Sequence, residues 1–144
     1  MKKLIATFTV ALFALASFAQ TKTTSPVIEF EKEVHDYGTI EQNGNGTYEF
    51  VFTNSGKEPL VISNCKGSCG CTVPSWPNEP IAPGSTGVIK VKYDTKHLGQ
   101  FQKSVTITSN SETPTKVIKI QGNVVAPQGN NLERGNSGAP VAKP

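Results

Sequence analysis

The sequence contains few of the residues that most often build catalytic sites. Its 144 residues include three cysteines, two histidines and one tryptophan. It has no Gly-x-Ser-x-Gly motif for a nucleophile, and its glycines are spread over separate turns instead of forming one phosphate-binding loop. The acidic residues are also scattered, and no pair of them is singled out for glycoside hydrolysis. We therefore expect that the protein is not an enzyme.

Long apolar runs are also scarce, and the single one lies at the N-terminus. Two lysines precede an apolar run over residues 4–15, and small residues follow at Ser17 and Ala19. This order is typical of a secretory signal peptide over residues 1–19. The run is shorter than the about 20 residues that cross a membrane, and no cysteine near Ala19 provides a lipid attachment site. We expect an exported protein, periplasmic or extracellular, without a transmembrane segment.

Strong charge of either sign is absent from the rest of the chain. The net charge is +3, and removal of residues 1–19 takes away two of the 14 basic residues and none of the 11 acidic ones, which leaves +1. So balanced a charge does not favour binding to nucleic acid or to an anionic membrane surface. We expect a linker over residues 20–26, one domain over 27–125, and a disordered tail over 126–144, which is rich in proline, glycine and asparagine.

Alternation of apolar and polar residues is the main pattern of the domain. Ile89, Val91 and Tyr93 alternate with lysines, which places them on one face of a strand. Residues 115–125 repeat this pattern, and Gly122 on their apolar face marks a bulge or the close approach of another segment. Strands are expected over residues 27–31, 48–53, 60–62, 88–94, 101–108 and 115–125. Turn residues separate them, and this spacing predicts an all-β antiparallel sandwich.

Several short segments are similar to those of a known family. They are residues 35–40 (His-Asp-Tyr-Gly-Thr-Ile), 52–56 (Phe-Thr-Asn-Ser-Gly), 60–62 (Leu-Val-Ile), 68–74 (Ser-Cys-Gly-Cys-Thr-Val-Pro), 80–84 (Pro-Ile-Ala-Pro-Gly) and 91–94 (Val-Lys-Tyr-Asp). Over residues 27–125 the chain resembles the domain-of-unknown-function 1573 family. The resemblance implies an immunoglobulin-like β-sandwich in exported bacterial proteins, most familiar from Bacteroidetes, and brings no known activity. Cys69 and Cys71 match the family's motif, whereas Cys65 lies outside it.

All three cysteines lie within seven residues, at Cys65, Cys69 and Cys71. We expect residues 64–74 to form a bent loop that brings the thiols together, because glycines lie between them. In an exported protein the first hypothesis is one local disulfide with one thiol left over. Pairing of Cys65 with Cys69 or Cys71 is less constrained than pairing of Cys69 with Cys71, since a bridge across one residue strains the backbone.

Two alternatives assign chemistry to the same cysteines. Three closely spaced sulfurs suit Cu(I), so Cys65, Cys69 and Cys71 are candidate metal ligands and copper is the candidate cofactor. Structural zinc is disfavoured, because His35 and His97 are far away in sequence. Thiol–disulfide exchange is the other alternative, although the sequence reveals no base or helix N-terminus that would activate a thiol.

The function that the sequence favours is a binding or structural module of the cell envelope. Such folds present loops or edge strands to partners, and we expect the partner to be an envelope protein or polymer, not nucleic acid. Trp76, in the sequence Pro-Ser-Trp-Pro, is the candidate partner-binding residue. The alternative is that its ring covers one end of the core beside the cysteines.

Overall fold

The computed structural model describes residues 24–128. The expected signal peptide and nearly all of the expected tail lie outside the described residues, so both stay predictions. Within residues 24–128, no helix is long and apolar enough to cross a membrane.

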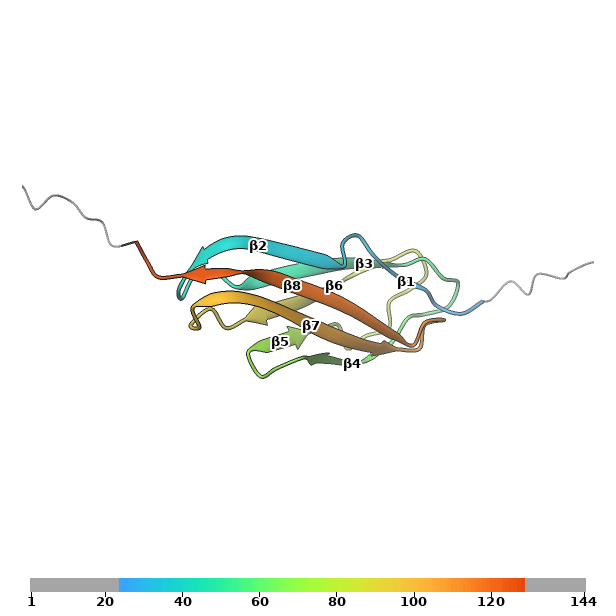
Figure 1. Ribbon diagram of the computed structural model, residues 1–144. Coiled ribbons are helices and arrows are strands. Elements are labelled where there is room, and N and C mark those ends of the chain that lie inside the picture. Colours follow the sequence, from blue (N-terminus) through green and yellow to red (C-terminus); the bar gives the residue numbers. More distant parts are fainter. Residues whose placement is uncertain (1–23, 129–144) are drawn as a thin grey trace, which may run out of the picture.

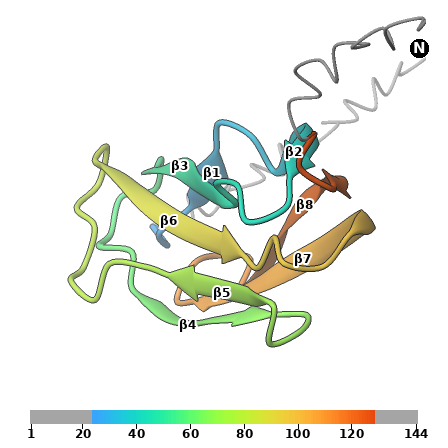
Figure 2. The same cartoon turned by 90° about the vertical axis from the view of Figure 1, so that its left-hand side faces the viewer.

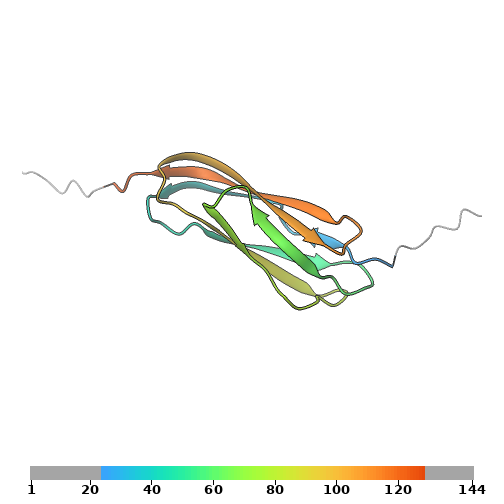
Figure 3. The same cartoon turned by 90° about the horizontal axis from the view of Figure 1, so that it is seen from below.

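Eight strands form two layers (Figure 1). The first sheet has the order β1-β3-β6-β5 and the second has the order β2-β8-β7-β4. The strands are β1 (Ile28–Phe30), β2 (Val34–Glu41), β3 (Thr47–Asn54), β4 (Ile62–Gly67), β5 (Thr72–Ser75), β6 (Thr86–Tyr93), β7 (Gly99–Ser109) and β8 (Thr115–Val125). Seen from below, most of them run lengthwise along one axis (Figure 3).

The predicted all-β sandwich is confirmed, with one difference in strand direction. All pairs are antiparallel except β2 with β8, which run parallel from Val34 opposite Lys119 to Glu41 opposite Val125. A tight hairpin forces its two strands to be antiparallel, whereas strands far apart in the chain have no such constraint. The first long strand and the last one are free to meet in parallel for this reason.

The core lies between the two inner faces. Along β6, burial alternates strictly, and the predicted inward residues Ile89, Val91 and Tyr93 are all buried. On β8 the expected close approach at Gly122 is confirmed, because a Cβ there would lie 3.0 Å from the ring of Phe101. Apolar alternation is therefore sufficient to define both inner faces at these strands.

One buried polar side chain, Asn54, ties together the loops at one end of the sandwich. Its Oδ1 accepts hydrogen bonds from the N–H groups of Val27 (3.3 Å) and Gly56 (3.1 Å). Its Nδ2 donates to the carbonyl oxygens of Glu58 (2.8 Å) and Ile81 (2.9 Å). The side chain is completely buried, so these four bonds satisfy a group that would otherwise be costly to bury.

The two ends of the described chain lie at opposite ends of the sandwich. Strand β1 begins at the right of Figure 1 and β8 ends at the left. The turn between β4 and β5, which contains Cys69 and Cys71, also lies toward the left of this view.

Candidate functional site

The cysteine segment is only partly the loop that its sequence predicts. Strand β4 continues to Gly67, so Cys65 lies in a strand and the loop is limited to residues 68–71. Pairing with β7 extends the strand to Gly67, and a bulge changes its register: from Ile62 to Asn64 the chain advances two residues while β7 advances one. Ile62 and Cys65 therefore both point into the core although three positions separate them. The prediction of one bent loop over 64–74 is right only for residues 68–71, because residues 64–67 belong to β4 and residues 72–74 to β5.

The disulfide joins Cys69 to Cys71, whose Cα atoms are 5.3 Å apart. This corrects the expectation that Cys65 would take part in the less constrained bridge. Cys65 is buried among core residues, and only 6% of the residue's surface is exposed. Its thiol therefore does not face the loop. The direction of Cys65, which the bulge turns into the core, outweighs ring size in deciding which sulfurs meet.

The turn that carries this disulfide connects the two sheets. Strand β4 belongs to the second sheet and β5 to the first, and the two lie side by side at one corner of the sandwich (Figure 2). We call Gly67 to Thr72 the cysteine hairpin. A Cβ on Gly67 would overlap the carbonyl oxygen of Thr72, so the two strands approach more closely than a side chain would permit.

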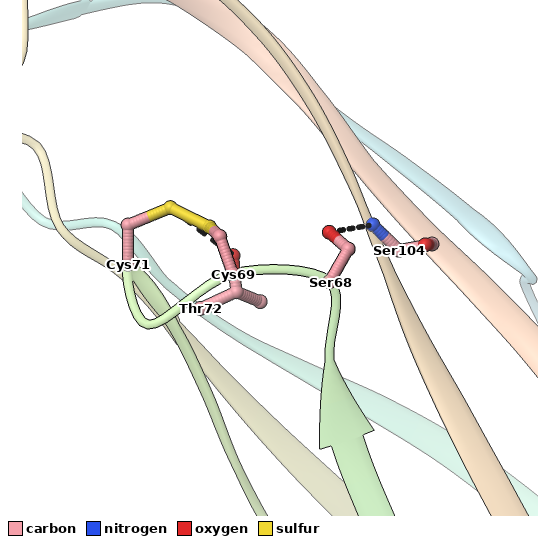
Figure 4. The surroundings of a disulfide bond; sticks show 5 residues. All are labelled: Ser68, Cys69, Cys71, Thr72 and Ser104. Atoms are coloured by element: carbon pink, nitrogen blue, oxygen red, sulfur yellow. Dashed lines mark hydrogen bonds between the residues drawn. A yellow bond between two sulfur atoms is a disulfide. The ribbon is translucent and has the colours of Figure 1, made fainter.

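Backbone hydrogen bonds fix the cysteine hairpin to both sheets. On the second sheet, the Ser68 N–H donates to the Ser104 carbonyl at 2.8 Å, and the Ser104 N–H donates to Ser68 Oγ at 3.2 Å (Figure 4). On the first sheet, the Asp94 N–H donates to the Cys71 carbonyl at 2.9 Å. The hairpin also closes on itself, since the Thr72 N–H donates to the Cys69 carbonyl at 3.1 Å. The tip is thus held from two sides.

A hollow of about 950 Å³ lies beside the cysteine hairpin. Its walls are the turn at residues 43–47, the hairpin residues Gly70 and Cys71, the exposed side chain of Val73, and residues 92–96 at the end of β6. Lysines and an aspartate line it together, so charges of both signs face the hollow. This hollow directly contacts Cys71 of the predicted cysteine site.

Burial makes Cys65 a poor nucleophile and a poor metal ligand. Desolvation raises the pKa of its thiol from 9.0 to about 12, and only the thiolate reacts or binds metal well. Within residues 24–128, no group of three or more His, Cys, Asp and Glu side chains converges to hold a metal ion. The structure does not bring the three sulfurs together, and copper binding stays a prediction that it does not test.

The other residues singled out from the sequence are placed as follows. Trp76 is half-buried and packs against the core, as its covering role predicts, while its role as a partner anchor stays a prediction. His35 stacks on Tyr48 with ring centroids 3.5 Å apart. Burial lowers the pKa of His35, the charge of Lys32 lowers it further, and Asp36 partly opposes both. His97 is exposed.

A second hollow, of about 710 Å³, was not predicted from the sequence. It lies on the outer face of the second sheet, and its lining includes Asp36, Thr39, Gln100, Gln102, Gln121 and Asn123. In the sequence these residues are the polar members of alternating strands, which look like an ordinary solvent-facing surface. Only the strand order brings them together.

A family model described as "Protein of unknown function (DUF1573)" matches residues 28–124. The chain belongs to this family. No protein with a curated description matches the sequence of this DUF1573 domain.

Solved structures show the same fold as this DUF1573 domain. A protein of unknown function from Porphyromonas gingivalis W83 is 17% identical, with a TM-score of 0.62 over 73% of this chain and 50% of that one. The human CEP192 PapD-like domain 7 is 9% identical, with a TM-score of 0.61 over 87% of this chain and 99% of that one. The YadV chaperone is 14% identical, with a TM-score of 0.52 over 72% of this chain and 54% of that one.

These likenesses confirm the fold class and nothing finer. The DUF1573 domain spans half of the P. gingivalis chain, and it covers 54% of the YadV chaperone. Sites differ freely among proteins that share a sandwich, so function has to be argued from this chain's own residues.

Proposed function

We propose that this DUF1573 domain is a non-enzymatic binding module of the bacterial cell envelope that presents the cysteine hairpin to a protein partner. Export rests on the signal peptide predicted over residues 1–19. The main support for the proposal is that the cysteine hairpin is held rigidly. Hydrogen bonds with the backbone of Ser104 and Asp94 hold its two sides, and the Cys69–Cys71 disulfide closes its tip.

Rigidity of this kind favours binding. A surface that is already ordered loses little conformational entropy when a partner docks, so more of the contact energy appears as affinity. The hairpin joins two sheets, and a partner that contacts it is positioned relative to the whole sandwich. The disulfide therefore has a role in holding a surface, which requires no catalytic thiol.

The surface around the cysteine hairpin has the mixed chemistry of a protein interface. Val73 is 59% exposed, which makes it an apolar centre at the edge of the hollow. Lys92, Asp94 and Lys96 provide charges of both signs around it. Interfaces between proteins combine an apolar centre with a polar rim in this way, whereas a site for a polyanion would carry basic residues without the aspartate.

Site-specific photo-cross-linking in cells tests this function. A benzophenone amino acid at position 73 should give a discrete protein adduct in the envelope fraction. The matched control is position 88, because Val88 is exposed on the outer face of the same sheet and paired with Val51, outside the hollow. The adduct should be lost when Cys69 and Cys71 are both replaced by serine.

Three outcomes contradict the proposal. Equal adducts at positions 73 and 88 would mean that contact is non-specific. An adduct that still forms after both cysteines are replaced would mean that partner binding does not need the rigidity that the disulfide gives to the hairpin. Recovery of the protein only from the cytosolic fraction would exclude the envelope.

Thiol–disulfide exchange is the second candidate, because the Cys69–Cys71 disulfide lies at a turn and is only half-buried. A thiolate of a partner dithiol would attack one of the two sulfurs and form a mixed disulfide. The partner's second thiolate would then release it, leaving the partner oxidised and Cys69 and Cys71 reduced. Reduction of the bridge by thioredoxin, followed by mass spectrometry with alkylation, tests this step, and no loss of the bridge would exclude it.

A further inference from the structure

Six polar side chains form a regular grid on the outer face of the second sheet, where β2, β8 and β7 run side by side (Figure 1). Strand register defines two neighbouring rows of three. One row is Asp36, Gln121 and Gln102, and the next is Thr39, Asn123 and Gln100. All six line the hollow of about 710 Å³, which we call the amide hollow.

The amide hollow coincides with an irregularity in β2. The register between β2 and β8 shifts between Asp36 and Thr39, and Gly38 has a φ of 63° in the left-handed region. The Gly38 N–H donates to Asp36 Oδ1 at 2.7 Å, which stabilises this bend. A bulge of this kind bends its strand out of the regular ladder, so the face is hollowed here instead of flat.

The chemistry of the amide hollow is that of hydrogen bonding without strong charge. Four of its six polar side chains are amides, each of which has two N–H donors and one carbonyl acceptor. Gln121 Nε2 donates to Asp36 Oδ2 at 2.9 Å, which orients both groups. This bond, together with that from Gly38, holds the pKa of Asp36 below its usual value, so the carboxylate only accepts. Hydrogen-bond donors and acceptors are thus both present around a single negative charge.

This chemistry excludes two classes of ligand. No lysine or arginine lines the amide hollow, so a phosphorylated ligand would face Asp36 without a compensating cation. An apolar ligand needs apolar walls, but the one apolar side chain in the lining, Phe101, is only 7% exposed. Sugar hydroxyl groups, in contrast, each donate and accept, as the side-chain amides do.

We propose that the amide hollow binds a neutral glycan, with Gln102, Gln121 and Asn123 bonded to neighbouring hydroxyl groups and Asp36 accepting from one of them. The amide hollow and the cysteine hairpin share no lining residue. The glycan proposal therefore does not depend on the function proposed for the hairpin.

A titration followed by ¹H–¹⁵N NMR tests the proposal on the full chain. The probes are neutral hexasaccharides of glucose, mannose, galactose and N-acetylglucosamine, and hexagalacturonate is the acidic control. At millimolar concentration, at least one neutral probe should shift the side-chain NH₂ signals of the four amides in the hollow. Hexagalacturonate should not shift these NH₂ signals, because its carboxylates would be repelled by the carboxylate of Asp36.

Variants decide whether those shifts come from the amide hollow. Gln102→Ala and Asn123→Ala should each weaken binding about fivefold to tenfold, as expected for the loss of one or two hydrogen bonds. Asn64→Ala is the matched control, since Asn64 is an exposed amide on β4 of the same sheet and does not line the hollow. Its affinity should be unchanged.

Several results would overturn the proposal. One is the absence of shifts with all four neutral probes, and another is an equal loss of affinity in Asn64→Ala. A third result concerns the cross-linking experiment. If Gln102→Ala abolishes the adduct at position 73, and no glycan shifts the amide signals of the parent protein, this face belongs to a protein interface. Glycan binding without an adduct at position 73 would support the amide hollow and contradict only the function proposed for the hairpin.

Discussion

Asn54 offers the sharpest test of what holds this sandwich together. Asn54→Asp keeps the shape of the side chain and both accepted hydrogen bonds, from Val27 and Gly56. It removes the two donated bonds and places a carboxylate oxygen against the carbonyl oxygens of Glu58 and Ile81. The substitution therefore changes hydrogen-bond polarity at a buried site without creating a cavity.

The expected loss of stability follows from the bonds that are broken. Each of the two lost hydrogen bonds removes about 1 kcal/mol, and the carboxylate buried against the two carbonyl oxygens adds a desolvation cost of about 1–3 kcal/mol. The Ile81 carbonyl keeps the bond that it accepts from the Leu60 N–H, and Glu58 is exposed, so neither carbonyl adds a large further cost. We expect the free energy of unfolding to fall by about 3–5 kcal/mol, a large part of the about 5–15 kcal/mol typical of a domain. Urea unfolding followed by the fluorescence of the single tryptophan, Trp76, measures this change.

The loss in Asn54→Asp should also depend on pH. Burial beside carbonyl oxygens raises the pKa of the new carboxyl in the folded state above its unfolded value of about 3.9. Stability is therefore most complete below that value and falls as pH rises through the folded pKa. The variant should be closer to the parent protein at about pH 4 than at about pH 7.

Asn110→Asp is the matched control. Asn110 also accepts from a backbone N–H, that of Val61 at 2.7 Å, and donates to a carbonyl, that of Pro59 at 3.1 Å, but it is exposed. Water can replace its lost bond, so its loss should stay below about 1 kcal/mol. Equal losses in the two variants, or a loss in Asn54→Asp that does not change with pH, would refute the reasoning.

Three further predictions concern the hairpin and the buried titratable groups. Gly67→Ala should lower the melting temperature measured by circular dichroism, with a loss of about 1–3 kcal/mol from overlap with Thr72; Gly70→Ala, where a Cβ meets nothing within 4 Å, should not, and equal melting would contradict this. Intact mass after alkylation without reductant should show one modified thiol in urea and almost none in the native state, whereas three in urea would exclude the disulfide. Because burial raises the pKa of Cys65 from 9.0 to about 12, stability is complete below about pH 9 and should fall toward pH 12; Cys65→Ala should reduce that slope, and an unchanged slope would contradict the assignment.

Regular strands could be predicted from the sequence because their pattern is local. The alternation of Ile89, Val91 and Tyr93 identifies the inner face of β6 without knowledge of any other strand. The bulge after Ile62 could not be predicted, because it depends on how β4 lies against β7 and not on β4 alone. The parallel pairing of β2 with β8 has the same origin, since its partners lie at opposite ends of the domain.

The candidate sites show the same division. Clustering of the cysteines in sequence correctly indicated that a disulfide forms within this segment, since Cys69 and Cys71 are joined. It did not indicate that Cys65 points into the core, because the bulge sets that direction. The grid of polar side chains around Gln121 could not be predicted from the sequence for another reason. Each of its rows crosses three strands, and no single strand contributes more than two of its six residues.

The opposite placement of the two ends of the described chain has a mechanical consequence. Tension applied between Ile28 and Val125 would act along the strands, so the ladders of β1 with β3 and of β2 with β8 would be loaded in shear. The ladder of β1 with β3 has only three paired residues, so it would yield first. The ladder of β2 with β8 would then share the force over six paired residues, instead of opening one bond after another as in a peeled hairpin. The Cys69–Cys71 bridge encloses a single residue, so it would shorten the pulled-out chain by only a few ångströms. Under load the domain would behave as a stiff link whose strength comes from its ladders and not from its disulfide.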